Sequence, residues 1–185
     1  MGDALPVVYL ARHGETAWTI SRQHTGATDL PLTAQGEAEA LRLGERLEGL
    51  KFATVLTSPL QRAVRTCELA GFGSAAEVDR DLMEWNYGAY EGRTSADIHA
   101  ERPDWQLFRD GCPGGESPEQ IGARADRVIR RVRAIEENTL LFSSGHFSEY
   151  SPRAGSGSTR GRAGISCWAR PASVRWGMST IDPIR

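Results

Sequence analysis

The residue types that could carry out chemistry stand at separate points of the chain, each beside an apolar run or a helical pattern. Arg12 and His13 directly follow the apolar run 6–11. Arg62 lies in the first turn of a helical stretch, and His146 follows a later apolar run. Arginine presents a planar fork of donors that matches phosphate oxygens, and neutral imidazole is a competent nucleophile near pH 7. These residue types predict a site that binds a phosphoryl group and accepts it on histidine.

Such a reaction also needs a group that protonates the leaving alkoxide. Glu84 is the candidate, because a carboxylic acid in a partly desolvated site can act as a general acid. The arginines would stabilise the charge of the transferring group, so this chemistry requires neither a metal nor a cofactor. Taken singly, each residue also has an ordinary structural interpretation as a hydrogen-bonded or ion-paired side chain. Their joint occurrence at several predicted strand ends favours the catalytic interpretation.

Short apolar runs and amphipathic stretches alternate along the chain and predict the elements that position these residues. The apolar runs predict buried strands at residues 6–11, 52–56 and 139–142. The amphipathic stretches predict helices at residues 33–50, 58–71 and 117–135. This alternation predicts an α/β fold with a mostly parallel sheet and helices on both faces. Ligands bind at the carboxyl ends of the strands in such sheets, where the candidate residues are expected to lie.

The start of each predicted helix carries a capping signal. Thr33 and Ser58 are the expected N-caps of the first two helices, with Pro59 at the first helical position of the second. The sequence Ser117-Pro-Glu-Gln120 has the pattern of a capping box and predicts the start of the third helix.

Composition excludes several other classes of protein. The 185 residues are 39% hydrophobic and 25% charged, as in one ordinary globular domain, and no apolar run approaches the ~18 residues of a membrane span. Residues 1–6 lack the pattern of a signal peptide, so a cytoplasmic protein is expected. The three cysteines form no CxxC pair, which argues against a disulfide framework or a zinc site. The net charge of −2 gives no reason to expect nucleic acid or a membrane surface as partner, and the oligomeric state stays open.

Five motifs in order resemble the histidine phosphatase superfamily, in its phosphoglycerate mutase-like branch that includes small sugar-phosphate phosphatases. The motifs are Arg12-His-Gly-Glu-Thr16, Thr25-Gly-Ala-Thr-Asp-Leu-Pro-Leu-Thr33, Ser58-Pro-Leu-Gln-Arg-Ala-Val-Arg-Thr66, Glu84 in its Gly-rich segment, and Pro113-Gly-Gly-Glu-Ser117. The resemblance is nearly continuous from residue 5 to residue 148. It implies a three-layer α/β/α sandwich around a mostly parallel sheet.

The resemblance also implies a role for each matching residue. His13 becomes the phosphohistidine, Arg12 and Arg62 hold the phosphate, and Glu84 donates the proton. The implied substrate-binding residues are Thr25, Gly26, Glu15, Tyr87 and Gly145.

One departure from the family affects the predicted chemistry. The family's second catalytic histidine directly precedes the glycine after the last of these strands, where this chain has Ser144. His146, two positions later, is the nearest imidazole in the sequence: either it takes this role from a shifted position, or the site lacks its second imidazole. Without a replacement, the loss of one electrostatic stabiliser would lower the rate on the order of 10² to 10³.

A second departure is the tail. Residues 1–147 contain 15 leucines and carry a net charge of −6, whereas residues 148–185 contain no leucine and carry a net charge of +4. The family would place a helix and a final strand there, and the tail shows neither pattern, so both elements are expected to be missing. We therefore expect two segments, a histidine phosphatase-like domain at 1–148 and an atypical tail at 149–185.

The hypothesis for the tail is a change of reading frame after Ser148. With one base restored and GC-rich codons chosen, the other frame yields an amphipathic helix and a β-rich strand that resemble the family's C-terminus. Lys51 is the single lysine against 21 arginines, which also fits a GC-rich gene.

The predicted function is hydrolysis of small phosphorylated metabolites, such as sugar phosphates, through a phosphohistidine. The compact length and the short segment between Glu84 and Gly114 resemble the small phosphatases more than the mutases. Two alternatives stay open: a phosphoglycerate mutase, and a catalytically silent phosphate-binding relative, which Ser144 and the tail make plausible.

Overall fold

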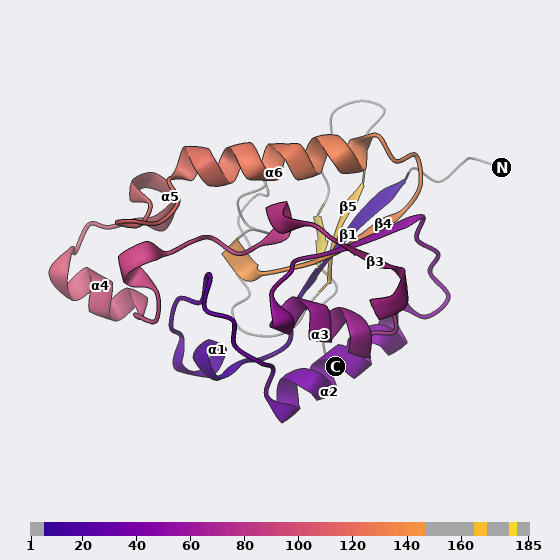
Figure 1. The fold of residues 1–185 in the computed structure, drawn as a ribbon, viewed down its shortest axis with the longest axis horizontal. Coiled ribbons are helices and arrows are strands. Elements are labelled where there is room, and N and C mark those ends of the chain that lie inside the picture. The colour runs from indigo at the N-terminus through magenta and orange to yellow at the C-terminus, as the bar shows by residue number, and fades with distance from the viewer. Residues whose placement is uncertain (1–5, 147–164, 170–177, 181–185) are drawn as a thin grey trace.

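The predicted strands form and lie side by side in one sheet. A computed structural model describes residues 6–146 and, for the backbone, residues 165–169 and 178–180. Its central strands are β1 (Val7–Arg12), β2 (Thr54–Thr57) and β4 (Thr139–Ser143), with the short β3 (Ala76–Val78) at the edge. These four strands are parallel in the order β3-β2-β4-β1 (Figure 1). The carboxyl ends of β1, β2 and β4 therefore meet at one edge of the sheet.

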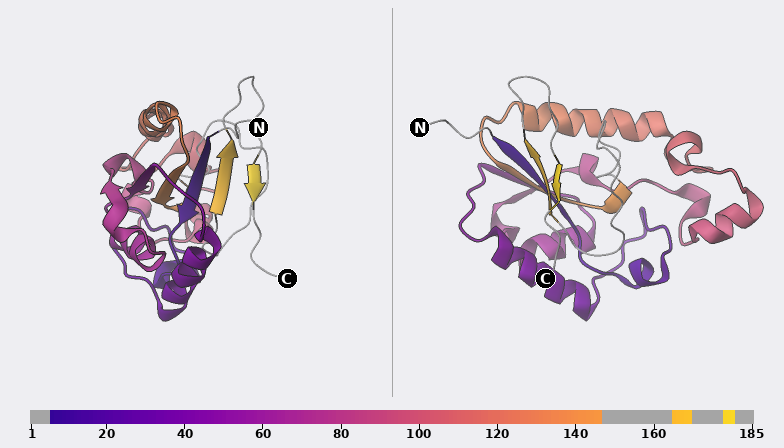
Figure 2. Two further views of the ribbon diagram at one scale, coloured as in Figure 1. Left: turned by 90° about the vertical axis from the view of Figure 1, so that its right-hand side faces the viewer. Right: turned by 180° about the vertical axis from the view of Figure 1, so that it is seen from behind.

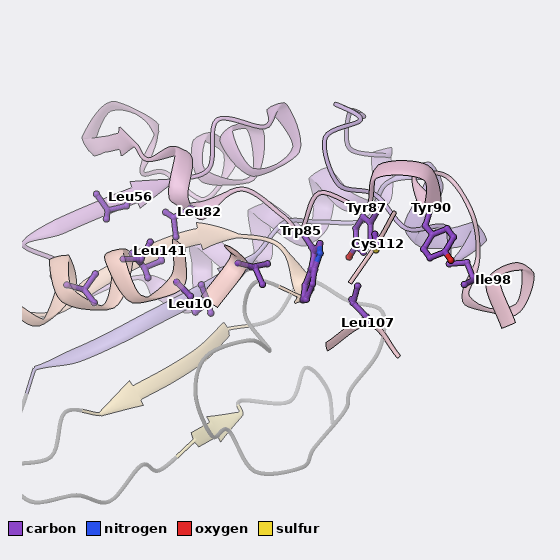
Figure 3. Close-up of a cluster of buried hydrophobic side chains, with 14 of the residues drawn as sticks. Leu10, Leu56, Leu82, Trp85, Tyr87, Tyr90, Ile98, Leu107, Cys112 and Leu141 are labelled. Carbon is purple, nitrogen blue, oxygen red and sulfur yellow. The ribbon is translucent and has the colours of Figure 1, made fainter. Parts of the chain in front are cut away.

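Each central strand is apolar on both faces because helices cover both sides of the sheet. Leu10, Leu56 and Leu141 belong to one core cluster, together with α6 (Pro118–Arg133). Figure 3 shows these leucines gathered at one end of the cluster, which continues through Trp85 to the aromatic and aliphatic residues near α4 (Ser95–Glu101).

The opposite face carries the second core cluster. Neighbouring strand residues such as Ala11, Val55 and Phe142 pack there, because successive side chains of a strand point to opposite faces. Their partners come from α2 (Ala34–Leu47) and α3 (Gln61–Leu69). Figures 1 and 2 show α6 on one side of the sheet and the α2–α3 pair on the other. The expected three-layer α/β/α arrangement is confirmed. Within the described part of the chain, no helix has the length and apolar character to cross a membrane.

Two of the three predicted caps are confirmed. The Thr33 hydroxyl accepts a hydrogen bond from the Gly36 N–H at 3.0 Å, and Ser117 forms the expected capping box with Gln120. These helices end at Leu47 and Arg133, slightly before the predicted ends. Thr33 and Ser117 thus fix the helix starts as the sequence predicts.

The predicted start of α3 at Ser58 and Pro59 is wrong. The helix begins at Gln61, after Leu60 as N-cap. The Ser58 N–H donates to the carbonyl oxygen of Phe142, which keeps this residue in line with the sheet, and the Ser58 hydroxyl accepts from the N–H of Leu60 at 3.4 Å, ahead of the first helical residue. A carboxylate oxygen of Asp29 accepts from the Gln61 N–H at 2.8 Å. A residue of another loop therefore satisfies the first N–H of the helix.

The remaining short elements have no counterpart among the predicted ones. They are α1 (Ala17–Ser21), α4, α5 (Leu107–Asp110) and three 3₁₀ turns, η1 (Gly73–Ala75), η2 (Arg80–Leu82) and η3 (Gly88–Tyr90). Each is too short to show a hydrophobic period, so packing against the rest of the chain decides its conformation.

The tail differs from expectation in one respect. Two strands occur in it, β5 (Ile165–Ala169) and β6 (Met178–Thr180), and β5 pairs antiparallel with β1. The free edge of β1 offers backbone donors and acceptors that a neighbouring segment can pair with, largely independently of its sequence. The predicted absence of a strand is therefore wrong, whereas the predicted absence of a helix concerns residues outside the described ones.

A contact between two glycines fixes the loop after β1 on α2. A Cβ atom at Gly14 would collide with the carbonyl oxygen of Gly36, and one at Gly36 would collide with the carbonyl oxygen of Glu15. Both neighbours are backbone atoms, which cannot move aside independently. The first turn of α2 therefore holds the segment that carries His13.

We expect Gly36→Ala to lower the free energy of unfolding by about 1–3 kcal/mol, as overpacking does, because the loop must shift to admit the methyl group. Urea titration measures this change. Gln35→Ala, at an exposed position of the same helix, is the matched control and should leave stability nearly unchanged. Equal stabilities for the two variants would contradict the inferred close packing.

Candidate active site

His13 lies just beyond the end of β1 and is held by its neighbours in the sheet and in α3. Its backbone N–H donates to the carbonyl oxygen of Ser143 at 3.1 Å, and the next N–H, of Gly14, donates to the hydroxyl of Thr66 at 3.1 Å. The side chain is 5% exposed. The predicted nucleophile is thus rigidly placed at the carboxyl edge of the sheet.

The imidazole of His13 has a defined tautomer. Its Nδ1 lies 2.8 Å from the carbonyl oxygen of Gly14, which can only accept, so Nδ1 carries the proton and Nε2 carries the lone pair. Burial, and then the charges of Arg62 and Arg12, lower the pKa of His13 from 6.5 to about 3. The ring is therefore neutral near pH 7, with Nε2 available for attack.

Arg62 places a fully buried guanidinium beside this ring. Nη1 donates to the carbonyl oxygen of Thr28 at 2.9 Å, and Nη2 donates to those of Thr25 and Gly26 at 3.1 and 2.9 Å. Among the described residues, Nε has no hydrogen-bond partner. A buried donor without a partner is costly, so Nε is the atom that an anionic ligand would satisfy.

Glu91 fixes the loop that contacts Arg62, a role that no pattern in the sequence predicts. One carboxylate oxygen accepts from the backbone N–H groups of Gly26 and Thr28 at 2.8 and 3.0 Å. The carbonyl oxygens of the same two residues accept from Arg62. The loop is therefore fixed between an anion on its N–H side and a cation on its carbonyl side.

Arg12 and Gly145 are brought together by the parallel pairing of β1 with β4. A Cβ atom at Gly145 would lie 3.1 Å from the guanidinium carbon of Arg12, so the arginine rests directly on the glycine backbone. A larger residue at position 145 would push the guanidinium away. Arg12 and Arg62 both lower the pKa of His13, which places both charges near the predicted nucleophile.

Glu84 and His146 meet at the same edge. One Glu84 carboxylate oxygen accepts from the backbone N–H of Trp85 at 2.8 Å, and the other accepts from the backbone N–H of His146 at 3.1 Å. The Nδ1 atom of His146 lies 4.0 Å from that second oxygen. The predicted acid and the predicted replacement imidazole are therefore neighbours. Ser144, by contrast, is fully buried directly after β4.

Tyr87 and His24 form the buried side of this cluster. The Tyr87 hydroxyl lies 2.6 Å from Nδ1 of His146, and the His24 ring lies 4.7 Å from the tyrosine ring. Burial, and then the charge of Glu84, raise the pKa of Tyr87 well above its ordinary value. Burial, and then His146, lower the pKa of His24 from 6.5 to about 4. Both groups are neutral near pH 7.

The other predicted substrate-binding residues serve the site through backbone contacts and loop anchoring. Thr25 and Gly26 present carbonyl oxygens to Arg62, and a Cβ atom at Gly26 would collide with the carbonyl oxygen of Trp85. The Glu15 carboxylate accepts from the hydroxyl of Thr33 at 2.8 Å and so ties the loop to α2.

Arg124 is a second positioning residue absent from the predicted set. From α6 it donates to the carbonyl oxygens of Asp81 and Met83, both at 2.7 Å, and pairs with both carboxylate oxygens of Glu116. It thereby holds the backbone that leads into Glu84. A sequence signal exists, because Arg124 falls on the buried face of α6 beside Ala125.

The described residues contain no group of three or more His, Cys, Asp or Glu side chains arranged to hold a metal ion. What they do bring together is a neutral imidazole, two guanidinium groups and a carboxyl group, at the carboxyl edge of a parallel sheet. This arrangement defines an α/β protein equipped to handle phosphate esters.

Comparison with known proteins gives the family. The sequence profile of the histidine phosphatase superfamily (branch 1) matches residues 8–154, and the chain belongs to this superfamily. An acid phosphatase of Mycobacterium tuberculosis is 41% identical over 145 residues, covering 75% of this chain and 70% of that protein. The sedoheptulose 1,7-bisphosphatase of Saccharomyces cerevisiae is 36% identical over 183 residues, covering 81% and 67%. A probable phosphoglycerate mutase GpmB of Salmonella choleraesuis is 34% identical over 148 residues, covering 75% and 69%.

Solved structures agree on the fold. The protein of the open reading frame Rv3214 from Mycobacterium tuberculosis superposes with a TM-score of 0.86 at 33% identity, covering 94% of this chain and 95% of that one. A phosphoglycerate mutase from Thermus thermophilus superposes with a TM-score of 0.71 at 31% identity, covering 94% and 99%. The predicted family and fold are confirmed.

We expect the low pKa of His13 to make stability depend on pH. The unfolded histidine takes up a proton below pH 6.5, whereas the folded one does so only near pH 3, so stability falls as the pH drops through this window. One such group contributes a slope of about 1.4 kcal/mol per pH unit.

Urea titrations between pH 4.5 and 6 give the slope of the free energy of unfolding against pH. For His13→Asn this slope should be smaller than for the unaltered protein, by the equivalent of about one proton. His99→Asn serves as the control, because that ring bonds to the Trp105 carbonyl oxygen outside the site. An unaltered slope in His13→Asn would show that His13 is not held neutral by the fold.

Proposed function

We propose that this protein is a phosphomonoesterase that acts through a phosphohistidine at His13. The observation that carries the proposal is the neutral imidazole between two arginines, with Nδ1 bound to a carbonyl oxygen and Nε2 unprotonated. The relatives named as an acid phosphatase and as a sedoheptulose bisphosphatase support it. No single feature of this site requires a mutase.

In the first step, Nε2 of His13 attacks the phosphorus and the bond from phosphorus to the ester oxygen breaks. Glu84 gives a proton to the departing oxygen, which leaves as an alcohol. Arg12 and the free Nε of Arg62 stabilise the phosphoryl charge. The products of this step are the alcohol, a phosphohistidine and the Glu84 carboxylate.

In the second step, water attacks the phosphohistidine. The Glu84 carboxylate accepts a proton from the water, the bond from phosphorus to Nε2 breaks, and inorganic phosphate leaves. The imidazole and the protonated carboxyl group are thereby restored. One residue acts as acid and then as base, as microscopic reversibility requires.

The proposed substrate is a small phosphorylated metabolite such as a sugar phosphate, in a cytoplasmic setting. The related sugar bisphosphatase and the charge of the site support this choice. The relatives named as probable phosphoglycerate mutases favour mutase activity as a second candidate. Ser144 favours a third, a silent phosphate-binding protein, since the imidazole expected there is absent. We further propose that residues 149–185 are read out of frame, which the nucleotide sequence around codon 148 tests.

The experiment that tests the enzyme proposal compares the unaltered protein with His13→Ala on an aryl phosphate. We expect His13→Ala to abolish turnover and the trapped phosphohistidine, because the change removes the proposed nucleophile. His99→Ala, which removes an imidazole outside the site, should keep both. Absence of turnover in all three proteins would favour the silent binder, and interconversion of 3-phosphoglycerate without net hydrolysis would favour the mutase.

Ser144→His should raise kcat if the missing imidazole limits the rate. A positive imidazolium beside the transferring group is worth on the order of 10² to 10³ in rate. Steady-state kinetics on the same aryl phosphate measure the gain, with circular dichroism confirming that the variant is folded. A folded Ser144→His protein without any gain would indicate that His146 already fills the role.

A further inference from the structure

The hydroxyl of Tyr87 is buried behind His146. The tyrosine side chain is 1% exposed, and its oxygen lies 2.6 Å from Nδ1 of His146. Within residues 6–146, His146 is the only hydrogen-bond partner found for this hydroxyl. The resemblance predicts that Tyr87 binds substrate, but the phenol lies behind the imidazole, which suggests a role through His146 instead.

The direction of this hydrogen bond follows from chemistry. The phenol keeps its proton near pH 7, because burial disfavours the phenolate. A buried O–H without an acceptor is costly, so the phenol donates to Nδ1, which then carries the lone pair of the ring. The ring proton is then on Nε2.

We place the exposed part of the His146 ring at the edge opposite Nδ1. The side chain is 36% exposed, and Nδ1 faces a buried hydroxyl, so the exposed part includes the edge that carries Nε2. The backbone N–H of His146 is fixed on the Glu84 carboxylate at 3.1 Å. The ring is thus held at two points, through its main chain and through Nδ1, next to the predicted acid.

We propose that Tyr87 is a positioning residue that fixes His146 in the Nε2–H tautomer, so that Nε2 presents an N–H donor to the substrate beside Glu84. The proposal rests on the proposed phosphatase function. Ser144 cannot supply the imidazolium that the family has at this position. The Nε2–H group of His146 gives the site a different donor. The ligand of this donor is an oxygen of the transferring phosphoryl group or of the leaving group.

The kinetic test is a double-mutant cycle. Tyr87→Phe removes one oxygen and keeps the buried ring, and we expect it to lower kcat about tenfold, the scale of one lost hydrogen bond near 1.4 kcal/mol. In a His146→Ala background, Tyr87→Phe should have no further effect on kcat, because its action passes through the imidazole. Tyr90→Phe is the matched control, since that buried hydroxyl accepts from Arg102 and should leave kcat unchanged.

The second readout does not depend on activity. Nitrogen-15 spectra of the His146 ring distinguish a protonated nitrogen from one that bears a lone pair, and we expect Nδ1 to be unprotonated and hydrogen-bonded in the unaltered protein. In Tyr87→Phe the hydrogen-bond shift at Nδ1 should disappear. A protonated Nδ1 in the neutral ring would overturn the proposal, as would an equal loss of kcat from Tyr87→Phe with and without His146.

The two readouts separate this proposal from the proposed function. If the unaltered protein has no turnover on the aryl phosphate, the phosphatase proposal fails, while the spectra still decide the tautomer. If His13→Ala abolishes turnover but the cycle is additive, the phosphatase proposal stands and the role of Tyr87 fails.

Discussion

The structure is organised around one buried charge. The guanidinium of Arg62 is removed from water, and burial lowers its pKa, while Glu84, Asp29 and Glu91 oppose that shift. A buried cation is tolerated only when its donors are satisfied and anions lie near. Three loop carbonyl oxygens satisfy two of its nitrogens and leave Nε for a ligand. The loops of the site take the shapes that meet this requirement.

Hydrogen bonds from other charged side chains to the backbone also fix the loops of the site. The apolar clusters fix the strands and helices, but they do not by themselves orient loops that contain few apolar residues. Arg124 reaches from α6 to the backbone before Glu84, and Glu91 reaches across to the loop that binds Arg62. Two charged residues outside the reacting groups therefore place the acid and one arginine. Tyr87 extends the arrangement to His146, so the site depends on an outer set of side chains as much as on the groups that meet substrate.

The sequence predicts the strands, the long helices and the residues at the strand ends well, because hydrophobic period and capping are local signals. Ser117 caps α6 as expected, whereas α3 begins only at Gln61, because Ser58 continues the line of the sheet through its bond to Phe142, far away in the sequence. The role of Glu91 could not be predicted from local signals either, because its partners lie more than 60 residues earlier in the chain. Tyr87 was assigned to the site from the resemblance, but only the burial of its hydroxyl distinguishes positioning from substrate contact.

The low pKa of His13 bears on the enzyme's working range as well as on its fold. A nucleophile that stays unprotonated down to about pH 3 is ready for attack throughout mildly acidic conditions. Any loss of rate on acidification would then report another titration, such as protonation of the substrate dianion. Burial, together with the two arginines proposed to bind phosphate, thus also keeps the proposed nucleophile from competing for protons.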